Sequence, residues 1–410
     1  MLLKLASRSL LSRKVNVGLT VFSISISIFI MLAIGHVKNE AKASFTSVVS
    51  GVDLIVGART GQINLLLYSI FRIGQPTNNI SWESYQALSA RKEVAWTIPI
   101  SLGDSHKGFR VLGTSSRYFS HFKYGNKREL VFSNGEQFNR PFDVVLGADV
   151  ARSLQYSLGD KITLSHGVAS TSFSEHANNP FTVVGILKPT GTSVDQTLHV
   201  PLEGIEAIHS GWQSGVNLSQ KLSSNDLDKV NLTPKTITAF MVGLKSKMAT
   251  FTFQRQVNQF QPEALMAILP GVSLAELWRM MGVIEGILLF ISSLVLLAAL
   301  IGMSTMMLTA IRERRKEFFV LRVIGASPWF IMCLIQAEAI LITLLGMCVA
   351  ILLLWTGILF SQDLLASHFG FFLSLNIFNR EMLMSLALVL VIVLFVSCIP
   401  AISSTRHAQL

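Results

Sequence analysis

The sequence predicts an α-helical membrane protein with four transmembrane helices and a large extracytoplasmic α+β domain. Its 410 residues are 50% hydrophobic and only 14% charged, whereas a soluble domain has about 25% charged residues. Four apolar segments are each long enough to form a helix that crosses a bilayer, which takes roughly 20 residues. Residues 38–278, between the first and the second of these segments, contain no further spanning segment and suffice for one or two folded domains.

The N-terminus predicts a basic amphipathic helix followed by a membrane span. Residues 1–14 carry four cations and no acid, with leucines on the other helical face, so we expect this helix to lie at the inner membrane surface. Residues 15–37 are apolar and form the first span. A cleaved secretory signal would also begin with cations, with Ala41-Lys42-Ala43 as its cleavage site. Because that site lies well past the apolar segment, we favour an uncleaved anchor with a cytoplasmic N-terminus.

Short strands and helices alternate through residues 38–278, which predicts an α+β domain. Because one span separates this domain from a cytoplasmic N-terminus, we expect it outside the cytoplasm, in the periplasm. Ser81 is expected to cap a helix that runs to about Ser89. Strands are expected over residues 94–101 and 107–113, with the turn between them at Gly103-Asp104. Further strands are expected over residues 142–146, 161–165, 181–187 and 235–244, and helices over residues 148–154, 202–209 and 247–260.

Residues 63–73 form an apolar stretch that is too short to cross a membrane. It is either a buried helix or a loop presented to the membrane, a partner or a substrate, and we favour a buried or interface element. If the stretch is presented, the side chains that would contact a substrate or partner are Leu65, Leu66, Leu67, Ile70 and Phe71.

No catalytic or metal site is expected. His166 and His176 flank Glu175, and Asp104 lies near His106, but neither group has ligand spacing, so we expect surface histidines. The three cysteines lie in apolar segments and form no disulfide or metal framework. The chain has no Gly-Lys pair and therefore no P-loop, so it needs a partner to hydrolyse ATP and should bind no cofactor itself. The net charge is +10, and much of the cationic excess lies beside the apolar spans, which argues against nucleic-acid binding.

The remaining spans follow in order. Residues 279–311 form the second span, within a helix from about residue 273 that exceeds the bilayer and should project outward as a stalk. Residues 329–360 form the third span and residues 381–402 the fourth. A short outer loop, residues 361–380, joins them, and residues 403–410 form a cytoplasmic tail. Glu285 and Glu338 are expected near the membrane interfaces.

Residues 312–328 form a cationic segment between the second and third spans, which should keep it cytoplasmic. Its apolar and charged residues alternate with helical periodicity, so an amphipathic helix is expected, ending at Gly325. Such a helix would offer a cytoplasmic partner a docking surface. An ordinary basic loop is the alternative.

This segment resembles the coupling segment of the FtsX/MacB/LolC-like ABC-transporter permeases, whose usual form is E-R-x-x-E-I-x-x-x-R-x-x-G-A. Phe318 stands where the isoleucine is usual. Residues 145–152, 158–164 and 181–191 are similar to the periplasmic domain of the MacB-type permeases. The resemblance implies docking to a cytoplasmic ABC ATPase through Glu313, Arg314, Arg315, Glu317, Phe318, Arg322 and Gly325.

The resemblance also implies a function. The chain would be the permease subunit of an ABC transporter in the bacterial inner membrane, paired with a second copy, most simply as a homodimer. The partner ATPase would bind ATP and Mg²⁺, and its hydrolysis would move the periplasmic domain mechanically to export or extract a substrate. The alternative is an FtsX-like regulator that activates a cell-envelope hydrolase. The outer partner, whether an adaptor, a lipoprotein or a hydrolase, would distinguish these functions, and membrane lipid surrounds the spans in each.

Overall fold

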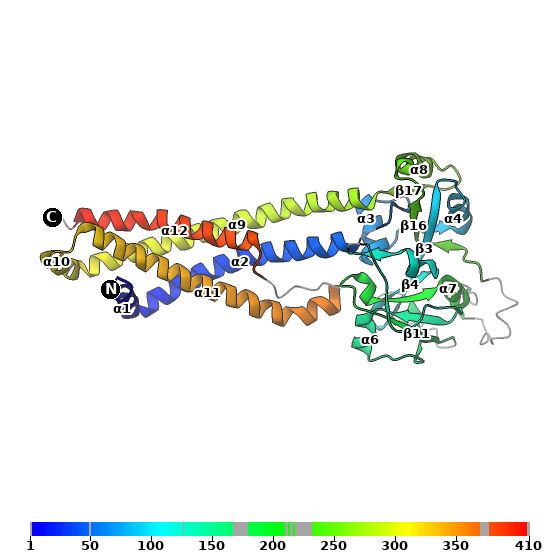
Figure 1. Cartoon of the computed structure of the whole chain (residues 1–410), viewed down its shortest axis with the longest axis horizontal. Coiled ribbons are helices and arrows are strands. Elements are labelled where there is room, and N and C mark those ends of the chain that lie inside the picture. Colours follow the sequence, from blue (N-terminus) through cyan, green and yellow to red (C-terminus); the bar gives the residue numbers. More distant parts are fainter. Residues whose placement is uncertain are drawn as a thin grey trace. The chain divides into compact units, whose positions relative to one another are not determined.

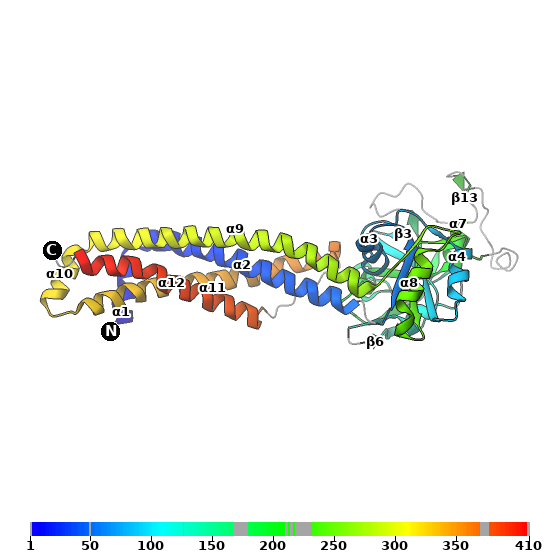
Figure 2. The ribbon, with the colours of Figure 1, turned by 90° about the horizontal axis from the view of Figure 1, so that it is seen from above.

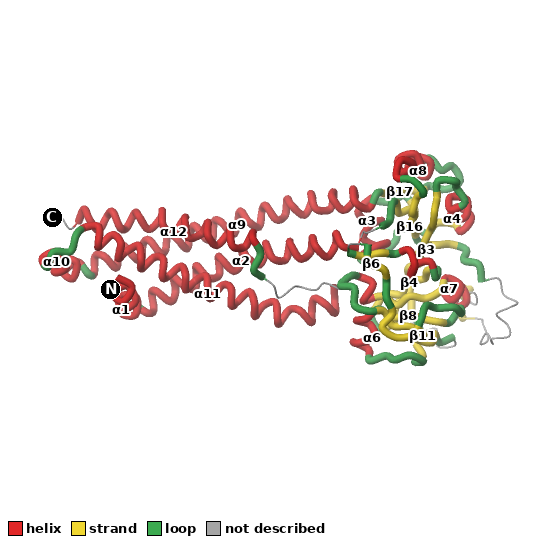
Figure 3. Tube along the Cα trace, in the orientation of Figure 1, coloured by secondary structure: helices red, strands yellow, loops and turns green. Residues whose placement is uncertain are grey.

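The computed structural model describes residues 2–48, 51–125, 127–166, 179–209, 212–213, 216–217, 232–369 and 377–407. The chain divides into two compact units. The helical unit comprises Met1–Ala41 and Met281–Leu410, and the sheet unit comprises Lys42–Met280. Figure 3 shows the strands gathered in the sheet unit.

Over the described residues, four helices are long and apolar enough to cross a membrane. They are α2 (Lys14–Val48), α9 (Pro270–Glu313), α11 (Pro328–Phe369) and α12 (Arg380–His407). The short helix α1 (Leu2–Ser12) precedes α2, and α10 (Arg315–Val323) connects α9 to α11. Figures 1 and 2 place both chain termini at the α10 end of this bundle. The predicted fold class, with four transmembrane helices, is confirmed.

The third long helix extends beyond the span that the sequence predicts. We expected it to end at residue 360, but α11 continues to Phe369. The added residues contain no glycine or proline, and several of them are good helix formers. Most of the expected outer loop and the last residues of the expected tail lie outside the described residues.

One apolar core holds the helical unit together. Ile24 of α2, Met303 of α9, Ile342 of α11 and Val393 of α12 are all buried within it. A Cβ atom on Gly346 would lie 2.9 Å from the Ile24 side chain, so this glycine allows α2 and α11 to approach closely. The opposite surfaces of the helices remain apolar and exposed, as expected for helices surrounded by lipid.

The sheet unit is built on a mixed sheet with the order β17-β1-β16-β3-β4-β12-β8-β11-β7. β12 pairs in parallel with β4, and β11 pairs in parallel with β8. The other strand pairs in this order are antiparallel. The strands are β1 (Leu54–Ala58), β3 (Val94–His106), β4 (Phe109–Thr114), β7 (Phe132–Gly135), β8 (Asp143–Leu146), β11 (Phe181–Leu187), β12 (Thr197–Pro201), β16 (Ala239–Leu244) and β17 (Leu265–Ile268).

Helices cover both faces of this sheet. Ile55 and Met241 lie in one core with α3 (Gln62–Leu66), the π-helix η1 (Leu67–Phe71) and α5 (Arg117–His121). Their neighbours along the strands point the other way, because successive strand residues alternate between faces. Those neighbours lie in a second core with α4 (Trp82–Ser89) and α8 (Thr250–Asn258). Strands β8, β11 and β12 share a third core with α6 (Ala148–Leu154) and α7 (Leu202–His209). Both faces of the central strands β1 and β16 are therefore buried, which explains why these two strands are apolar along their length.

Several predicted elements of this domain are confirmed. The backbone N–H of Ser84 donates to the Ser81 hydroxyl at 3.3 Å, so Ser81 caps α4 as expected. The strand over residues 181–187 and the helices over residues 148–154 and 202–209 match β11, α6 and α7. The prediction of a turn at Gly103-Asp104 is wrong.

β3 runs through Gly103 and Asp104 as far as His106, and the turn falls at Lys107-Gly108. These two residues have φ of 47° and 88°, as in the two-residue hairpin turns that fit the twist of paired strands. The pairing register of β3 with β4 shifts between Leu102 and Ser105, so Gly103 and Asp104 form a β-bulge within β3.

The expectation of a surface histidine is wrong for His106. Its side chain is buried, with ring nitrogens 2.6 Å from the Thr163 carbonyl oxygen and 2.9 Å from the Tyr156 hydroxyl. His106 is therefore a structural residue that joins β3 to the segment beside it. Glu175, His176 and the side chain of His166 lie outside the described residues.

Candidate docking site

The candidate docking site is formed where the long helix α9 breaks into α10. Arg314 interrupts the helix, with φ −96° and ψ 18°, and serves as the N-cap residue of α10. At the other end, Gly325 has φ +101°, a left-handed conformation that glycine adopts without steric cost. Its N–H donates to the Arg322 carbonyl at 3.0 Å, so the predicted helix stop is present.

A tight connection follows. The Ser327 hydroxyl accepts a hydrogen bond of 3.3 Å from the Phe330 N–H, and Pro328 is the first residue of α11. Proline fits that position because the first helical N–H has no partner within the helix. Pro328 therefore ends the loop between α10 and α11 and begins α11. The short loop holds α10 between two spans.

One face of α10 is exposed and largely apolar. The exposed fractions are 69% for Phe319, 53% for Val320, 71% for Val323 and 78% for Ile324. Isolated exposed apolar residues are common, but a contiguous patch flanked by charges is typical of a protein interface. We call these four residues the α10 ridge. Trp329, at the start of α11, is 71% exposed as well.

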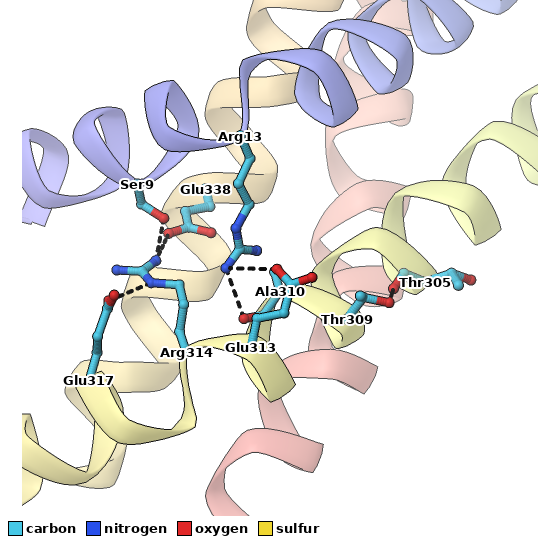
Figure 4. Close-up of polar contacts among 9 residues, drawn as sticks. All are labelled: Ser9, Arg13, Thr305, Thr309, Ala310, Glu313, Arg314, Glu317 and Glu338. Carbon is cyan, nitrogen blue, oxygen red and sulfur yellow. Dashed lines mark hydrogen bonds and ion pairs between the residues drawn. The ribbon is translucent and has the colours of Figure 1, made fainter.

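Arg314, by contrast, points into its own chain (Figure 4). Its side chain is only 19% exposed. Its guanidinium lies 2.6 Å from Glu317 of α10 and 3.4 Å from Glu338 of α11, and it donates to the Ser9 hydroxyl of α1. Arg314 therefore connects three helices, and its predicted role in direct docking does not fit this orientation.

A second arginine forms a similar contact (Figure 4). Arg13 lies at the junction of α1 and α2, and its Nη2 donates to the Ala310 carbonyl of α9 at 2.9 Å. The same atom lies 3.7 Å from Glu313. The Ala310 carbonyl also accepts a backbone hydrogen bond of 3.1 Å from the Arg314 N–H, so Arg13 supplies a second donor to this carbonyl at the end of α9.

Some of the other residues of the predicted docking set are described by the structure. Glu313 and Glu317 are exposed, with side-chain exposures of 63% and 61%. Arg322 is half-buried. The side chains of Arg315 and Phe318 lie outside the described part of the chain.

Polar contacts also occur at the other end of the bundle. Lys38 of α2 pairs with Glu285 of α9 at 2.7 Å. Asn39 of α2 donates to Glu381 of α12 at 2.9 Å. The two intramembrane acids, Glu285 and Glu338, are thus each paired with a cation, which reduces the cost of an acid within the membrane.

The apolar stretch of residues 63–73 is a buried element of the sheet unit. Leu65 and Leu66 are fully buried, Ile70 is 1% exposed and Phe71 8% exposed, while Leu67 is half-buried. They share a core with the start of α9. This burial matches the favoured interpretation and does not fit direct contact with a substrate.

Ionisable side chains are buried in the sheet unit too. His199 packs against the rings of Tyr118 and Phe119, and burial lowers its pKa to about 3. Burial raises the pKa of Asp195, although its carboxylate accepts hydrogen bonds from Thr190 and Gly191. Over the described residues, no three His, Cys, Asp or Glu residues form a metal-binding group. We therefore regard these residues as structural.

Sequence reasoning missed three members of the network around α10. Ser9, Arg13 and Glu338 come from segments that are distant in sequence, and nothing local indicates that they meet. One signal was available, because an acid within a spanning helix needs a cationic partner. The cations before Val15 and after Ile311 were the candidates for Glu338.

Comparison with known proteins gives two matches that together extend over most of the chain. The family model of the MacB-like periplasmic core domain matches residues 17–260. That of the FtsX-like permease C-terminal region matches residues 289–408. No match to a curated protein was found.

Two solved structures are similar in part. The periplasmic region of MacB from Actinobacillus actinomycetemcomitans is 12% identical, with a TM-score of 0.36 over 56% of this chain and 94% of that one. The extracellular domain of the ABC-type transporter YknZ from Gram-positive bacteria is 13% identical, with a TM-score of 0.31 over 52% of this chain and 98% of that one. On the two family matches, the chain belongs to the FtsX/MacB-like family of ABC permeases.

Proposed function

We propose that this protein is the transmembrane subunit of an ABC transporter whose partner ATPase docks on α10. Hydrolysis by that partner would move the extracytoplasmic domain mechanically and so export or extract a substrate at the inner membrane. ATP and Mg²⁺ would be bound by the partner, since the sequence has no P-loop.

The observation that carries this proposal is the α10 ridge. Phe319, Val320, Val323 and Ile324 are exposed on a short helix held between two spans by defined breaks at Arg314 and Gly325. An apolar helical face with charges around it suits a groove on a partner protein. The cations of α1 and α10 lie at one end of the bundle, which supports a cytoplasmic position for that end.

A path for movement is also present. α9 has 44 residues, which corresponds to about 66 Å at 1.5 Å per residue. That is roughly twice the thickness of a bilayer core. Leu274, near its start, is buried in the sheet unit, and its last residue, Glu313, adjoins α10. A continuous helix of this kind would carry a displacement of α10 to the outer domain.

The proposal includes a second copy of the chain. Val283, Ile287 and Phe290 are exposed along α9, and each would face either lipid or a second permease. A symmetric pair of ATPases would then dock on two α10 helices, as expected for a closed dimer. The moved substrate, and an adaptor, lipoprotein or hydrolase as outer partner, belong to the same proposal.

The docking surface is tested with Phe319→Asp and, as the matched control, Phe251→Asp. Phe251 is an equally exposed phenylalanine, at 72%, on α8 of the sheet unit. Burying an aspartate in an interface core should weaken capture of the ATPase at least about 10-fold. Phe251→Asp should leave capture unchanged. Equal capture by both variants would contradict docking at the α10 ridge.

A further inference from the structure

The two arginines at the α10 end of the bundle form reciprocal contacts. Arg13, at the α1–α2 junction, binds the last turn of α9. Arg314, at the α9–α10 junction, binds Ser9 of α1. Each helix junction is therefore held by the neighbouring one, and a rotation at either junction would disturb both contacts.

Glu338 is the buried acidic member of this network. It lies ten residues after Pro328, which is about 15 Å along α11. Its side chain is 12% exposed, and its Oε1 lies 3.4 Å from Arg314 Nη1. A carboxylate buried within a spanning helix is costly unless it is paired, so the position of Glu338 determines where the Arg314 guanidinium is stable.

Arg314 also sets the direction of α10. It is the residue at which α9 ends and α10 begins, and its Nε lies 2.6 Å from Glu317, one turn into α10. With Glu338 on one side and Glu317 on the other, the guanidinium joins the third span to the first turn of the docking helix. The four side chains of the α10 ridge form no ion pair of this kind, because they are apolar and exposed.

We infer that Arg314 and Glu338 form a positioning ion pair that orients α10, while the ATPase is contacted by the α10 ridge. This inference rests on the proposed function and assigns separate roles to residues of the same segment. The ridge provides binding. The Arg314–Glu338 pair transfers the movement of α10 to α11, and the Arg314–Ser9 contact transfers it to α1, in addition to the direct path through α9.

A charge exchange separates the two roles. The single substitutions Arg314→Glu and Glu338→Arg should each retain capture of the ATPase within about 3-fold of wild type. Each should reduce the effect of the permease on ATP hydrolysis in lipid nanodiscs about 10-fold, the size of a close coupling energy. The double substitution R314E/E338R should restore part of that effect, because it rebuilds the pair between α11 and position 314 with opposite polarity, while the new carboxylate repels only the exposed Glu317.

A neutral pair of glutamines is the second test if the protein with exchanged charges does not fold. R314Q/E338Q leaves no unpaired charge at the buried Glu338 position, and the Glu317 carboxylate that loses its cation is exposed to solvent. The double variant should therefore retain more coupling than either Arg314→Gln or Glu338→Gln alone. Phe319→Asp is the opposite control, since it should lose capture while the purified permease keeps its thermal stability.

Two outcomes would overturn the inference alone. One is a wild-type complex that is captured and coupled while both double variants are as uncoupled as their single parents. The other is loss of capture by Arg314→Gln to the same extent as by Phe319→Asp, which would place Arg314 in the docking contact. A wild-type permease that captures no ABC ATPase would contradict the proposed function, and this inference with it.

Discussion

Arg13 and Ala310 lie 297 residues apart in the sequence, yet the guanidinium of Arg13 donates a 2.9 Å hydrogen bond to the backbone carbonyl of Ala310. The contact joins the start of the first span to the end of the second. It also lies one turn before the point where α9 gives way to α10. The connection between the N-terminal helices and the docking segment is thus part of the folded bundle.

Replacement of Arg13 should loosen this connection. Arg13→Ala removes the hydrogen bond to Ala310 and the weaker ion pair with Glu313, and should lower the free energy of unfolding by about 1–3 kcal/mol. Thermal unfolding of the protein in nanodiscs measures the change. Lys14→Ala removes the neighbouring exposed cation and should have little effect. Equal losses in the two variants would argue against the Arg13 contact.

Gly325→Ala should impair docking through the backbone. A Cβ atom at Gly325 meets nothing within 4 Å, so the cost comes from its φ of +101° and is about 1–2 kcal/mol. We expect weaker capture of the ATPase because the end of α10 shifts. Gly302→Ala, which is equally open but lies within α9, should be neutral or slightly stabilising. Unchanged capture with Gly325→Ala would show that this turn is not needed.

Truncation within the buried apolar stretch should destabilise the sheet unit. Leu66→Ala removes a fully buried side chain and should cost about 2–5 kcal/mol. Leu158→Ala removes a leucine that is 46% exposed and should cost about 0.5 kcal/mol or less. Limited proteolysis with thermal unfolding measures both. A Leu66→Ala protein of normal stability that fails only in substrate binding would favour the contact role instead.

His199 should make the sheet unit sensitive to acid. Burial lowers its pKa to about 3, whereas an unfolded histidine has a pKa of about 6.5. Below pH ~6.5 the unfolded state therefore binds a proton that the folded state excludes. The free energy of unfolding should fall by up to about 1.4 kcal/mol per pH unit as the pH decreases.

His199→Phe keeps an aromatic ring beside Tyr118 and should flatten this dependence between about pH 6.5 and 5. Urea unfolding across that interval measures the slope. An unchanged slope in the variant would assign the acid sensitivity to other groups.

The elements predicted well are those with local causes. The helix cap at Ser81 and the helix stop at Gly325 follow from hydrogen bonding and backbone freedom at single residues. The four spans follow from uninterrupted apolar sequence. The turn after β3 was misplaced because Gly103-Asp104 and Lys107-Gly108 are both acceptable turn pairs, and only pairing with β4 decides between them.

The sequence could not predict which side chains of the docking segment point into the bundle. Arg314 belongs to a cationic helix that looks exposed throughout, and its contact with Ser9 spans 305 residues. Periodicity placed Arg314 on the charged face of α10, where docking was the natural interpretation. Only the packing of α1 and α11 against that face turns the side chain inward.

The most direct test of the proposed function is purification of the wild-type protein together with the ABC ATPases of the same cell, followed by ATP hydrolysis in lipid nanodiscs. We predict a stable complex with one of them, whose rate of ATP hydrolysis differs from that of the isolated ATPase. If no ATPase is retained, or if its rate is the same with and without the permease, α10 is an ordinary basic connection and the proposed coupling is wrong.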